Sequence, residues 1–239
     1  MIVIDLPALH DAGILVPGQV RSALAEQFRH LKRPLLRNAR SNAEGPEHPG
    51  TLIQVTSALP GEGKTYCAIN LAMSMAMEVD TGVILVDADV IRPSVFARLG
   101  VESTAPGLLD LLTRTDLALP DALISTNVPK LTLMGAGNPS LRSTELLASA
   151  AMDRLLRQLA TEYADHVVIF DAPPLLLTSE SVVLASKVGQ VVMVVESGAT
   201  RQDSVREAFV ALRHCPVVLS VLNKCDEQTG KGRYGYYER

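Results

Sequence analysis

The stretch from Ser57 to Thr65 carries residue types that hold phosphate groups. Its sequence is Ser-Ala-Leu-Pro-Gly-Glu-Gly-Lys-Thr, and it lies between the apolar run 51–56 and a helical pattern that begins at Lys64. Successive backbone N–H groups of a glycine-bearing turn converge on an anionic oxygen, and the start of a helix adds unpaired N–H groups. This arrangement predicts a phosphate-binding loop in which Lys64 reaches the terminal phosphates and the Thr65 hydroxyl binds Mg²⁺.

The loop departs from the usual pattern at one position, where Ala58 replaces a glycine. The last three residues, which carry the phosphate and metal contacts, are intact. A chance Gly-Lys-Thr at a helix start is the alternative, and the strand before, the helix after and the glycine within the turn argue against it. The contacts to ATP are therefore expected from Pro60, Gly61, Glu62, Gly63, Lys64, Thr65 and Tyr66.

Three aspartates follow two apolar runs. Asp87 and Asp89 come after the run 82–86, and Asp171 comes after the run 166–170. Ligands bind at the carboxyl ends of the strands in an open α/β sheet, and one or two carboxylates suffice for Mg²⁺. Aspartates also cap turns after strands, but three of them beside a phosphate loop favour a functional site. We expect Asp171 to hold the metal, while one acid of the other pair accepts a proton and its neighbour supports the metal.

The elements that position these residues alternate along the chain. Several of the apolar runs are nearly unbroken and β-branched, which is typical of strands buried on both faces of a parallel sheet. The sequence therefore predicts a three-layer α/β fold with a mostly parallel central sheet. The expected strands are 51–56, 82–86, 131–134, 166–170, 190–195 and 216–222, and the expected helices are 64–78, 146–161, 178–187 and 201–212.

The flanks of this core have a different character. Residues 1–17 are expected to be extended, and a helix is expected from about Pro17 to Arg33, with Pro34 kinking or ending it. Leu24, Phe28, Leu31 and Leu35 would form its apolar face, and residues 38–50 read as a loop. Three parts follow: an N-terminal segment 1–50, a core 51–225 and a flexible tail 226–239.

Composition excludes several classes of protein. The chain has 239 residues, a net charge of -4 and a hydrophobic fraction of 47%, so nothing indicates binding to nucleic acid. Cys67, Cys215 and Cys225 are odd in number and lack Cys-x-x-Cys spacing, so neither a disulfide framework nor a zinc site is indicated. No apolar run nears the ~20 residues of a membrane helix, and the N-terminus has no basic leader, so we expect a cytoplasmic protein.

Three motifs in order resemble those of the bacterial tyrosine kinases, the autokinases of exopolysaccharide and capsule synthesis. The stretch 57–65 is similar to their Walker A motif. Ile-Leu-Val-Asp-Ala-Asp-Val-Ile-Arg-Pro at 84–93 is similar to their Walker A′ motif, and Val-Ile-Phe-Asp-Ala-Pro-Pro at 168–174 to their Walker B motif. The resemblance extends over about residues 15–225, and Lys32-Arg33-Pro34-Leu35-Leu36 is closest to the subgroup linked to exosortase and exopolysaccharide loci. It implies a P-loop NTPase fold.

The resemblance also implies roles for the site residues. Lys64 and Thr65 would bind phosphate and Mg²⁺, Asp171 would support Mg²⁺, and Asp87 would be the base for a tyrosine hydroxyl with Asp89 near the metal. Asp87 and Asp89 could exchange these roles. Together they define a catalytic set of Lys64, Asp87, Asp89 and Asp171, and a metal set of Thr65, Asp89 and Asp171.

The N-terminal helix resembles the family's Glu-x-x-Arg-x-x-Arg helix, which packs protomers into a ring. Glu26 and Arg29 match, but Lys32 stands at the last position and lacks the planar fork of arginine. An ordinary amphipathic surface helix is the alternative. The family further implies a separate integral-membrane partner, a polysaccharide co-polymerase or chain-length regulator, that would activate the kinase and hold it at the inner membrane. Asn223, after the last strand, is either an adenine contact or a turn residue.

The last six residues contain three tyrosines, Tyr234, Tyr236 and Tyr237, among glycine and charged residues. They resemble the family's C-terminal cluster of phosphoacceptors; a sticky or docked aromatic tail is the alternative. The sequence thus predicts an ATP-dependent protein-tyrosine autokinase acting in trans on these tyrosines. Two alternatives are an ATP-switched scaffold and a partition-type ATPase, although Leu59 stands where partition ATPases usually carry an extra lysine.

Overall fold

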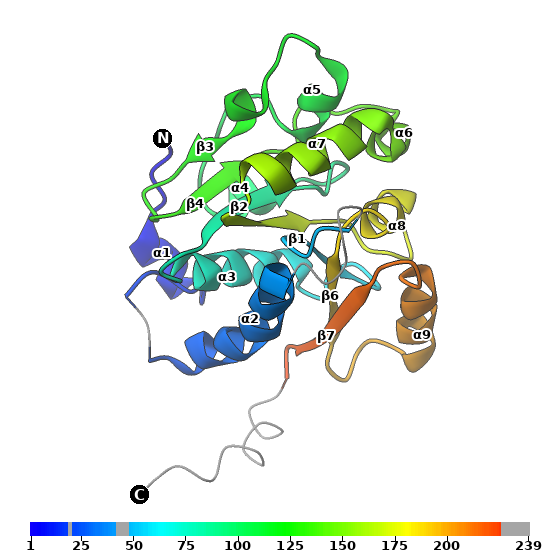
Figure 1. The fold of residues 1–239 in the computed structure, drawn as a ribbon. Helices are drawn as coiled ribbons and strands as arrows, with labels where there is room; N and C mark the ends of the chain where they lie inside the picture. The colour runs from blue at the N-terminus through cyan, green and yellow to red at the C-terminus, as the bar shows by residue number, and fades with distance from the viewer. Residues whose placement is uncertain (19–20, 42–47, 226–239) are drawn as a thin grey trace, which may run out of the picture.

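A seven-stranded sheet forms the centre of the computed structural model, which describes residues 1–18, 21–41 and 48–225 (Figure 1). The strand order is β3-β4-β2-β5-β1-β6-β7. The short β3 pairs antiparallel with β4, and the other neighbours are parallel. The strands are β1 Leu52–Ser57, β2 Gly82–Asp87, β3 Ile124–Ser125, β4 Leu131–Met134, β5 His166–Asp171, β6 Gln190–Glu196 and β7 Val217–Asn223.

The central strands are buried on both faces, because successive side chains point to opposite sides. Along β2, Val83 and Leu85 belong to one apolar cluster, and Ile84 and Val86 belong to the other. Two separate cores therefore lie above and below one sheet. This explains why the strands read as unbroken apolar runs, and it confirms the predicted mostly parallel, three-layer α/β architecture.

Each core is closed by its own set of helices (Figure 1). The first core is covered by α1 Leu6–Asp11, α2 Ala23–Ser41, α3 Lys64–Ala76 and α4 Val95–Arg98. The second core is covered by α5 Leu108–Thr113, a 3₁₀ helix Leu119–Ala122, α6 Ser143–Ala148, α7 Ala150–Glu162, α8 Ser179–Ala185 and α9 Gln202–Ala211.

The predicted strands coincide with observed ones to within a residue at each end, but one predicted helix was wrong. The expected helix 146–161 is two helices, α6 and α7, that meet at Ser149. Ser149 has an extended backbone with ψ of 160°, and its hydroxyl oxygen accepts the backbone N–H of Met152. A capping serine ends one helix and starts the next, yet it leaves the helical spacing of the apolar residues nearly unchanged. The sequence pattern therefore gave no sign of the break.

The N-terminal helix was also predicted with the wrong bounds. Helix α2 begins at Ala23, where the Ser22 hydroxyl accepts the N–H of Ala25 at 3.0 Å, and it passes Pro34 to end at Ser41. Proline removes a single backbone donor from the helix. Beyond it, Leu35, Leu36 and Ala39 are buried in the first core, and this burial favours continuation over termination.

Residues 1–17 are not simply extended, since they contain α1, whose first turn is capped by Asp5 accepting the N–H of Ala8 at 3.0 Å. The predicted loop 38–50 loses its first residues to α2, and residues 42–47 lie outside the described part. So does the predicted tail 226–239.

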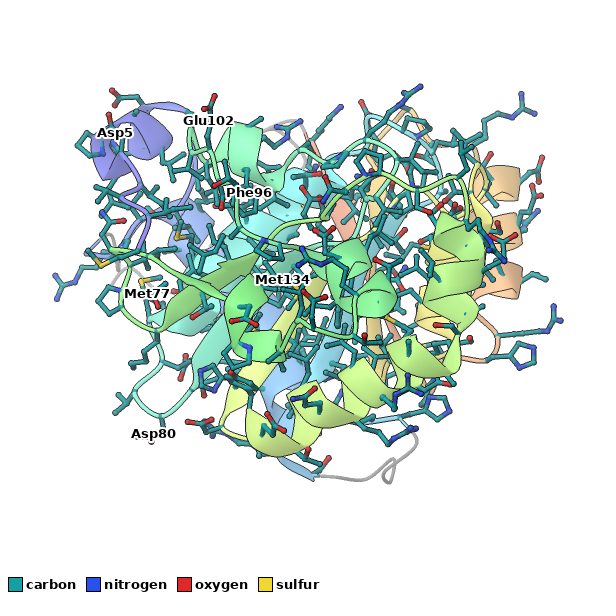
Figure 2. All side chains as sticks on the ribbon, turned by 90° about the horizontal axis from the view of Figure 1, so that it is seen from above. Asp5, Met77, Asp80, Phe96, Glu102 and Met134 are labelled. Carbon is teal, nitrogen blue, oxygen red and sulfur yellow. The ribbon has the colours of Figure 1, made fainter. Side chains whose placement is uncertain are left out.

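Side chains fill both faces of the sheet when the molecule is seen from above (Figure 2). Met134, at the end of β4, lies in the interior and is fully buried, whereas Asp5, Asp80 and Glu102 lie at the periphery. Among the described residues, no helix has both the length and the apolar character needed to cross a membrane.

Candidate active site

The loop between β1 and α3 has the backbone shape that a phosphate site needs. Gly61 and Gly63 have φ angles of +87° and +97°, in the left-handed region that residues with a side chain rarely adopt. Helix α3 then begins at Lys64 with no side chain capping its first turn. The N–H groups at this end are therefore available for an anion, as the sequence predicted.

Glu62 and Asn223 hold this loop in place from behind. The buried carboxylate of Glu62 accepts the N–H of Leu59 at 2.7 Å and the hydroxyl of Thr200. The Asn223 amide donates to the Glu62 carbonyl at 2.8 Å. Both side chains are therefore engaged with the protein itself, so the predicted contact of Glu62 with the nucleotide would have to come from its backbone. Asn223 is a brace between β7 and the loop rather than a plain turn residue.

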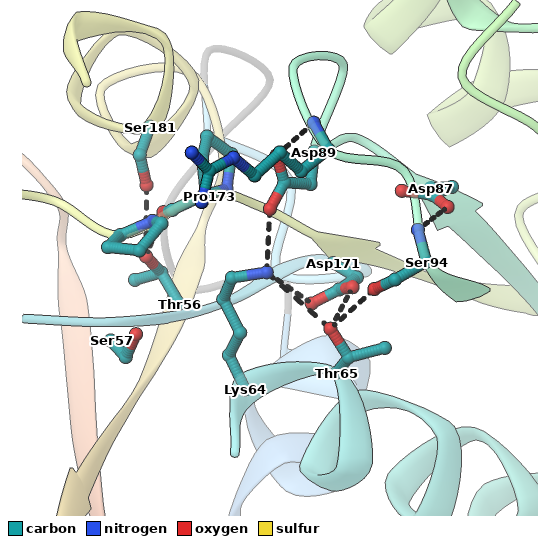
Figure 3. A network of polar contacts seen from close by, with 12 residues as sticks. Thr56, Ser57, Lys64, Thr65, Asp87, Asp89, Ser94, Asp171, Pro173 and Ser181 are labelled. Atoms are coloured by element: carbon teal, nitrogen blue, oxygen red, sulfur yellow. Dashed lines mark hydrogen bonds and ion pairs between the residues drawn. The ribbon is translucent and has the colours of Figure 1, made fainter. Parts of the chain in front are cut away.

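Lys64 and Thr65 connect the loop to the aspartates (Figure 3). The Lys64 ammonium donates to Asp89 Oδ2 at 2.7 Å and lies 3.9 Å from Asp171 Oδ1. The Thr65 hydroxyl donates to Asp171 Oδ2 at 2.7 Å and lies 3.2 Å from the Ser94 hydroxyl. The structure thus brings the predicted residues of three separate motifs into one network.

The two acids that follow β2 differ in their partners. Asp87 Oδ2 accepts the backbone N–H groups of Ser94 and Val95, both at 2.9 Å, so it holds the start of α4. Its second oxygen, Oδ1, is buried and has no hydrogen-bond partner. Asp89 instead uses one oxygen for Lys64 and the other for the N–H of Arg92 at 3.0 Å. A free acceptor atom therefore remains on Asp87.

Burial raises the pKa of two of these carboxyl groups. The pKa of Asp87 is raised to about 7, chiefly because its side chain is desolvated and then because the charge of Asp171 lies nearby. The pKa of Asp171 is raised to about 6 by burial, although Lys64 and the Thr65 hydroxyl oppose this shift. Burial therefore favours the protonated form of both carboxyl groups when no cation beyond Lys64 and Arg98 is near.

The carboxylates fit a hard divalent cation such as Mg²⁺. Oδ1 of Asp171, like that of Asp87, is buried without a hydrogen-bond partner, and carboxylate oxygens are the ligands that Mg²⁺ takes. Within the described ranges no group of three or more His, Cys, Asp or Glu side chains would hold an ion unaided. Mg²⁺ needs only one or two protein carboxylates when phosphates and water complete its shell. Asp89, a predicted ligand, is paired with Lys64 here.

Tyr66 does not face the phosphate loop. Its hydroxyl donates to the carbonyl of Gly13 at 2.9 Å, and its own carbonyl accepts the Asn70 amide. Asn70 Oδ1 in turn accepts the N–H of Leu15 at 2.8 Å. The Tyr66 side chain anchors the N-terminal segment to α3, so the predicted contact of Tyr66 with the nucleotide would have to come from its backbone.

The predicted oligomer helix presents only part of its motif at the surface. Glu26 and Arg29 form an ion pair with each other. Lys32 is 6% exposed, and its ammonium donates to the carbonyl of Ser74 at 2.6 Å and lies 2.7 Å from Glu78 Oε1. Lys32 therefore packs α2 onto α3 and has no exposed charge to offer another protomer. The predicted acceptors Tyr234, Tyr236 and Tyr237 lie outside the described residues.

Sequence reasoning missed Ser94 and Thr200. Ser94 directly follows the Arg-Pro that ends the second motif, and a serine next to such a motif offers a weak signal for a site residue. Thr200 lies between β6 and α9, far from any motif, and only the fold brings it to Glu62.

Known proteins are similar to this chain in sequence and fold, although no family model matches it. The tyrosine-protein kinase YwqD of Bacillus subtilis is 31% identical over 227 residues, which cover 94% of this chain and 90% of that protein. The kinase domain of the Escherichia coli tyrosine kinase ETK superposes with a TM-score of 0.72 at 25% identity, over 87% of this chain and 78% of that domain.

A third protein shares the fold alone. The septum site-determining protein MinD of Pyrococcus horikoshii, solved with Mg-ADP, has a TM-score of 0.59 at 20% identity and covers 72% of this chain and 69% of its own. The fold is thus that of a P-loop NTPase. The relationship to YwqD over nearly the whole of both chains, together with the joined motifs, shows that this chain belongs to the bacterial tyrosine kinases and is a protein-tyrosine kinase.

Proposed function

We propose that this kinase uses ATP and Mg²⁺ to phosphorylate Tyr234, Tyr236 and Tyr237 of another copy of itself, and that this reaction regulates exopolysaccharide synthesis or export. The observation that supports it best is the unpaired Oδ1 of Asp87, which lies in one network with Lys64 and Thr65. A buried carboxylate with a spare acceptor atom suits removal of a proton from an incoming hydroxyl.

The loop and Lys64 hold the phosphates of ATP in this mechanism. Lys64 now donates to Asp89, so phosphate oxygens must replace that carboxylate as its partner when ATP binds. Asp171 and Thr65 would hold Mg²⁺, which when bound neutralises charge on the phosphates. The backbone brace from Asn223 keeps the loop in its anion-binding shape during this exchange.

The transfer step joins the tyrosine oxygen to the γ-phosphorus of ATP. As that bond forms, the bond from the γ-phosphorus to the oxygen bridging it to the β-phosphorus breaks, and ADP leaves with the bond's electron pair. The phenolic proton goes to Asp87. The burial that raises the pKa of Asp87 to about 7 makes it a stronger base than an exposed aspartate and leaves much of it ionised near neutral pH.

In this proposal a membrane protein activates the kinase, and the unphosphorylated kinase assembles into a ring of protomers. A separate integral-membrane polysaccharide co-polymerase would supply an activating cytoplasmic segment and hold the kinase at the inner membrane. Each phosphotyrosine adds up to about two negative charges. Several on adjacent tails would repel one another and the acidic site, so phosphorylation would dissociate the ring.

Mixing a form without the catalytic lysine and a form without the acceptor tyrosines tests transfer between copies. One form carries Lys64→Met and keeps its tyrosines, and the other keeps Lys64 but ends at Gly232. With ATP, Mg²⁺ and the partner segment, we expect phosphotyrosine by mass spectrometry only in the mixture, and only on the Lys64→Met chain. ATP turnover by the unmodified protein without any phosphotyrosine would support an ATP-switched scaffold instead.

A further inference from the structure

A cavity of about 350 Å³ lies beside Asp87 at the carboxyl ends of β2 and β4. It is separate from the phosphate loop, since no residue of 57–65 lines it. One wall comes from α4 and the loop after it, and the opposite wall comes from the start of α5 and the turn after β4. Its lining includes Asp87, Pro93, Phe96, Ala105, Pro106 and Gly135.

The cavity lies next to the place where the terminal phosphate of a bound nucleotide is expected. Lys64 and Thr65 point toward Asp89 and Asp171, so the terminal phosphate belongs at the ends of β5 and β2. Asn223 braces the loop from β7, on the far side of β1. The cavity therefore adjoins the expected position of the terminal phosphate. Asp87, at the end of β2, lies between the two and lines the cavity.

The lining is largely polar, but one part of it can pack against a flat aromatic ring. Phe96, Pro93 and Pro106 supply apolar surfaces, and Gly135 leaves room beside the Phe96 ring. Asp110 does not oppose such a ring, because its carboxylate already accepts the N–H of Gly107 at 2.9 Å and the Asn138 amide at 2.7 Å. A ring in contact with Phe96 would gain edge or stacked aromatic contacts.

A second hollow of about 670 Å³ continues the first across Phe96, Ser103 and Thr104. Its charged side chain is Glu102, which is exposed and makes no ion pair within the described part of the chain. Figure 2 shows Phe96 and Glu102 on the same side of the molecule. In the chain's own sequence, Lys231 and Arg233 precede Tyr234, so the residues before an acceptor tyrosine carry the complementary charge.

We propose that the cavity beside Asp87 receives the ring of an acceptor tyrosine from a second copy of this chain, and that Glu102 selects basic residues on its N-terminal side. The inference rests on the proposed function and names the acceptor subsite of that reaction. The tyrosine's oxygen meets the γ-phosphorus, its proton passes to Asp87, and ADP leaves as above. The tail of a second copy is the chosen occupant, because the proposed reaction runs between copies and because Lys231 and Arg233 of that tail complement the charge of Glu102.

The pocket is tested by filling it. Ala105 is exposed and lines the cavity, so Ala105→Trp should block it without disturbing the core; Ala118→Trp, at an exposed loop position outside the lining, is the matched control. The substrate is the peptide Gly-Lys-Gly-Arg-Tyr-Gly-Tyr-Tyr-Glu-Arg, which is residues 230–239. We expect the KM for this peptide to rise about tenfold or more in Ala105→Trp, the loss anticipated when an aromatic ring is excluded from its contacts with Phe96 and the two prolines, while the Kd for ATP stays at the unmodified value. An unchanged KM, or an equal loss of ATP affinity, would overturn the proposal.

A charge exchange tests Glu102. Glu102→Arg should raise the KM for the peptide, and a peptide with Glu at the positions of Lys231 and Arg233 should restore it in that variant while being a poor substrate for the unmodified protein. Equal behaviour of the two peptides would refute the role of Glu102. Calorimetric binding of the peptide in the presence of ADP separates the two proposals: peptide that binds and is not phosphorylated contradicts the kinase reaction alone, whereas peptide that does not bind contradicts the pocket.

Discussion

The phosphate side and the acceptor side of this site are built in opposite ways. The phosphate side is one contiguous segment, 57–65, whose shape is fixed by two glycines and braced by Asn223 and Thr200. The acceptor side gathers Asp87, α4, the loop after α4, α5 and the turn after β4 around a cavity. The first is a local property of the chain, and the second exists only once the sheet has formed.

The support of the phosphate loop and the aspartates at the strand ends also differ in how their buried polar groups are satisfied. Glu62 has partners for both carboxylate oxygens. By contrast, Asp87 and Asp171 each keep one buried oxygen without a hydrogen-bond partner. Such groups cost stability in a protein interior, so they are informative about function. The difference separates a preformed support from the atoms that remain free to take a metal and a proton.

Loss of Lys64 should break the phosphate side most severely. In Lys64→Met the ammonium is gone, and the unmatched carboxylates of Asp89 and Asp171 would repel the phosphates. We expect ATP affinity and tyrosine transfer to fall together by at least about 100-fold, as measured by calorimetry and phosphotyrosine mass spectrometry. Lys187→Met removes a lysine that pairs with Asp153 away from the site and serves as control. Transfer that persists in Lys64→Met would contradict the assignment of the loop.

Asp87→Asn should separate the two sides. An asparagine oxygen can still accept the N–H groups of Ser94 and Val95, but it cannot take a proton from tyrosine. Tyrosine transfer should fall about 100-fold or more, the usual weight of a general base, while the Kd for ATP changes little. Asp5→Asn, which likewise alters an aspartate that caps a helix, should leave transfer intact. Equal loss of ATP affinity in Asp87→Asn would assign Asp87 to the nucleotide instead.

This contrast explains how much the sequence could predict. The parallel sheet and the residues at its strand ends could be predicted, because buried strands appear as apolar runs in the sequence. The carboxyl ends of parallel strands also lie together at one edge of the sheet. Lys64, Thr65 and Asp171 meet as expected for the same reason. Their contacts follow from local motifs and from a topology that leaves few alternatives.

The rest depended on contacts between residues far apart in the chain. The Tyr66 side chain follows the loop in sequence, yet it points to Gly13, because the N-terminal segment packs on α3. Lys32 matches a surface motif, yet it is buried against Glu78. Helix α2 passes Pro34 because the residues beyond it are buried. No periodicity reveals such choices, since each depends on which surface the segment covers.

Two glycines allow a finer test of the phosphate side. A side chain at Gly61 or Gly63 must adopt a left-handed backbone, which costs about 1–2 kcal/mol at either position. At Gly63 it would also collide with the Asn223 amide and displace it from the Glu62 carbonyl, whereas nothing lies near Gly61. Gly63→Ala should therefore be less stable than Gly61→Ala by about 1 kcal/mol in urea denaturation. Equal stabilities would show that the brace contributes nothing.

The smallest effect should come from Asp87 on the acceptor side, as a dependence of the free energy of unfolding on pH. The raised pKa of Asp87, about 7, means that the folded protein keeps a proton which the unfolded chain releases near its ordinary pKa of 3.8. The contribution of Asp87 to the free energy of unfolding is therefore fully present below about pH 4, and it is lost as the pH rises through 7. Between pH 6 and pH 7, without metal or nucleotide, the melting temperature should fall by on the order of a degree or two from this group.

Asp87→Asn tests that contribution, because it removes the carboxyl group that carries the raised pKa. The difference in melting temperature between the variant and the unmodified protein should widen as the pH rises from 6 to 7, in favour of the variant, since asparagine has no charge to bury. Phosphate-side variants such as Gly61→Ala should shift the melting temperature equally at both pH values, because no carboxyl group is altered. A difference that is constant with pH for Asp87→Asn would mean that the Asp87 carboxylate is ionised throughout, and that both sides of the site are equally well compensated.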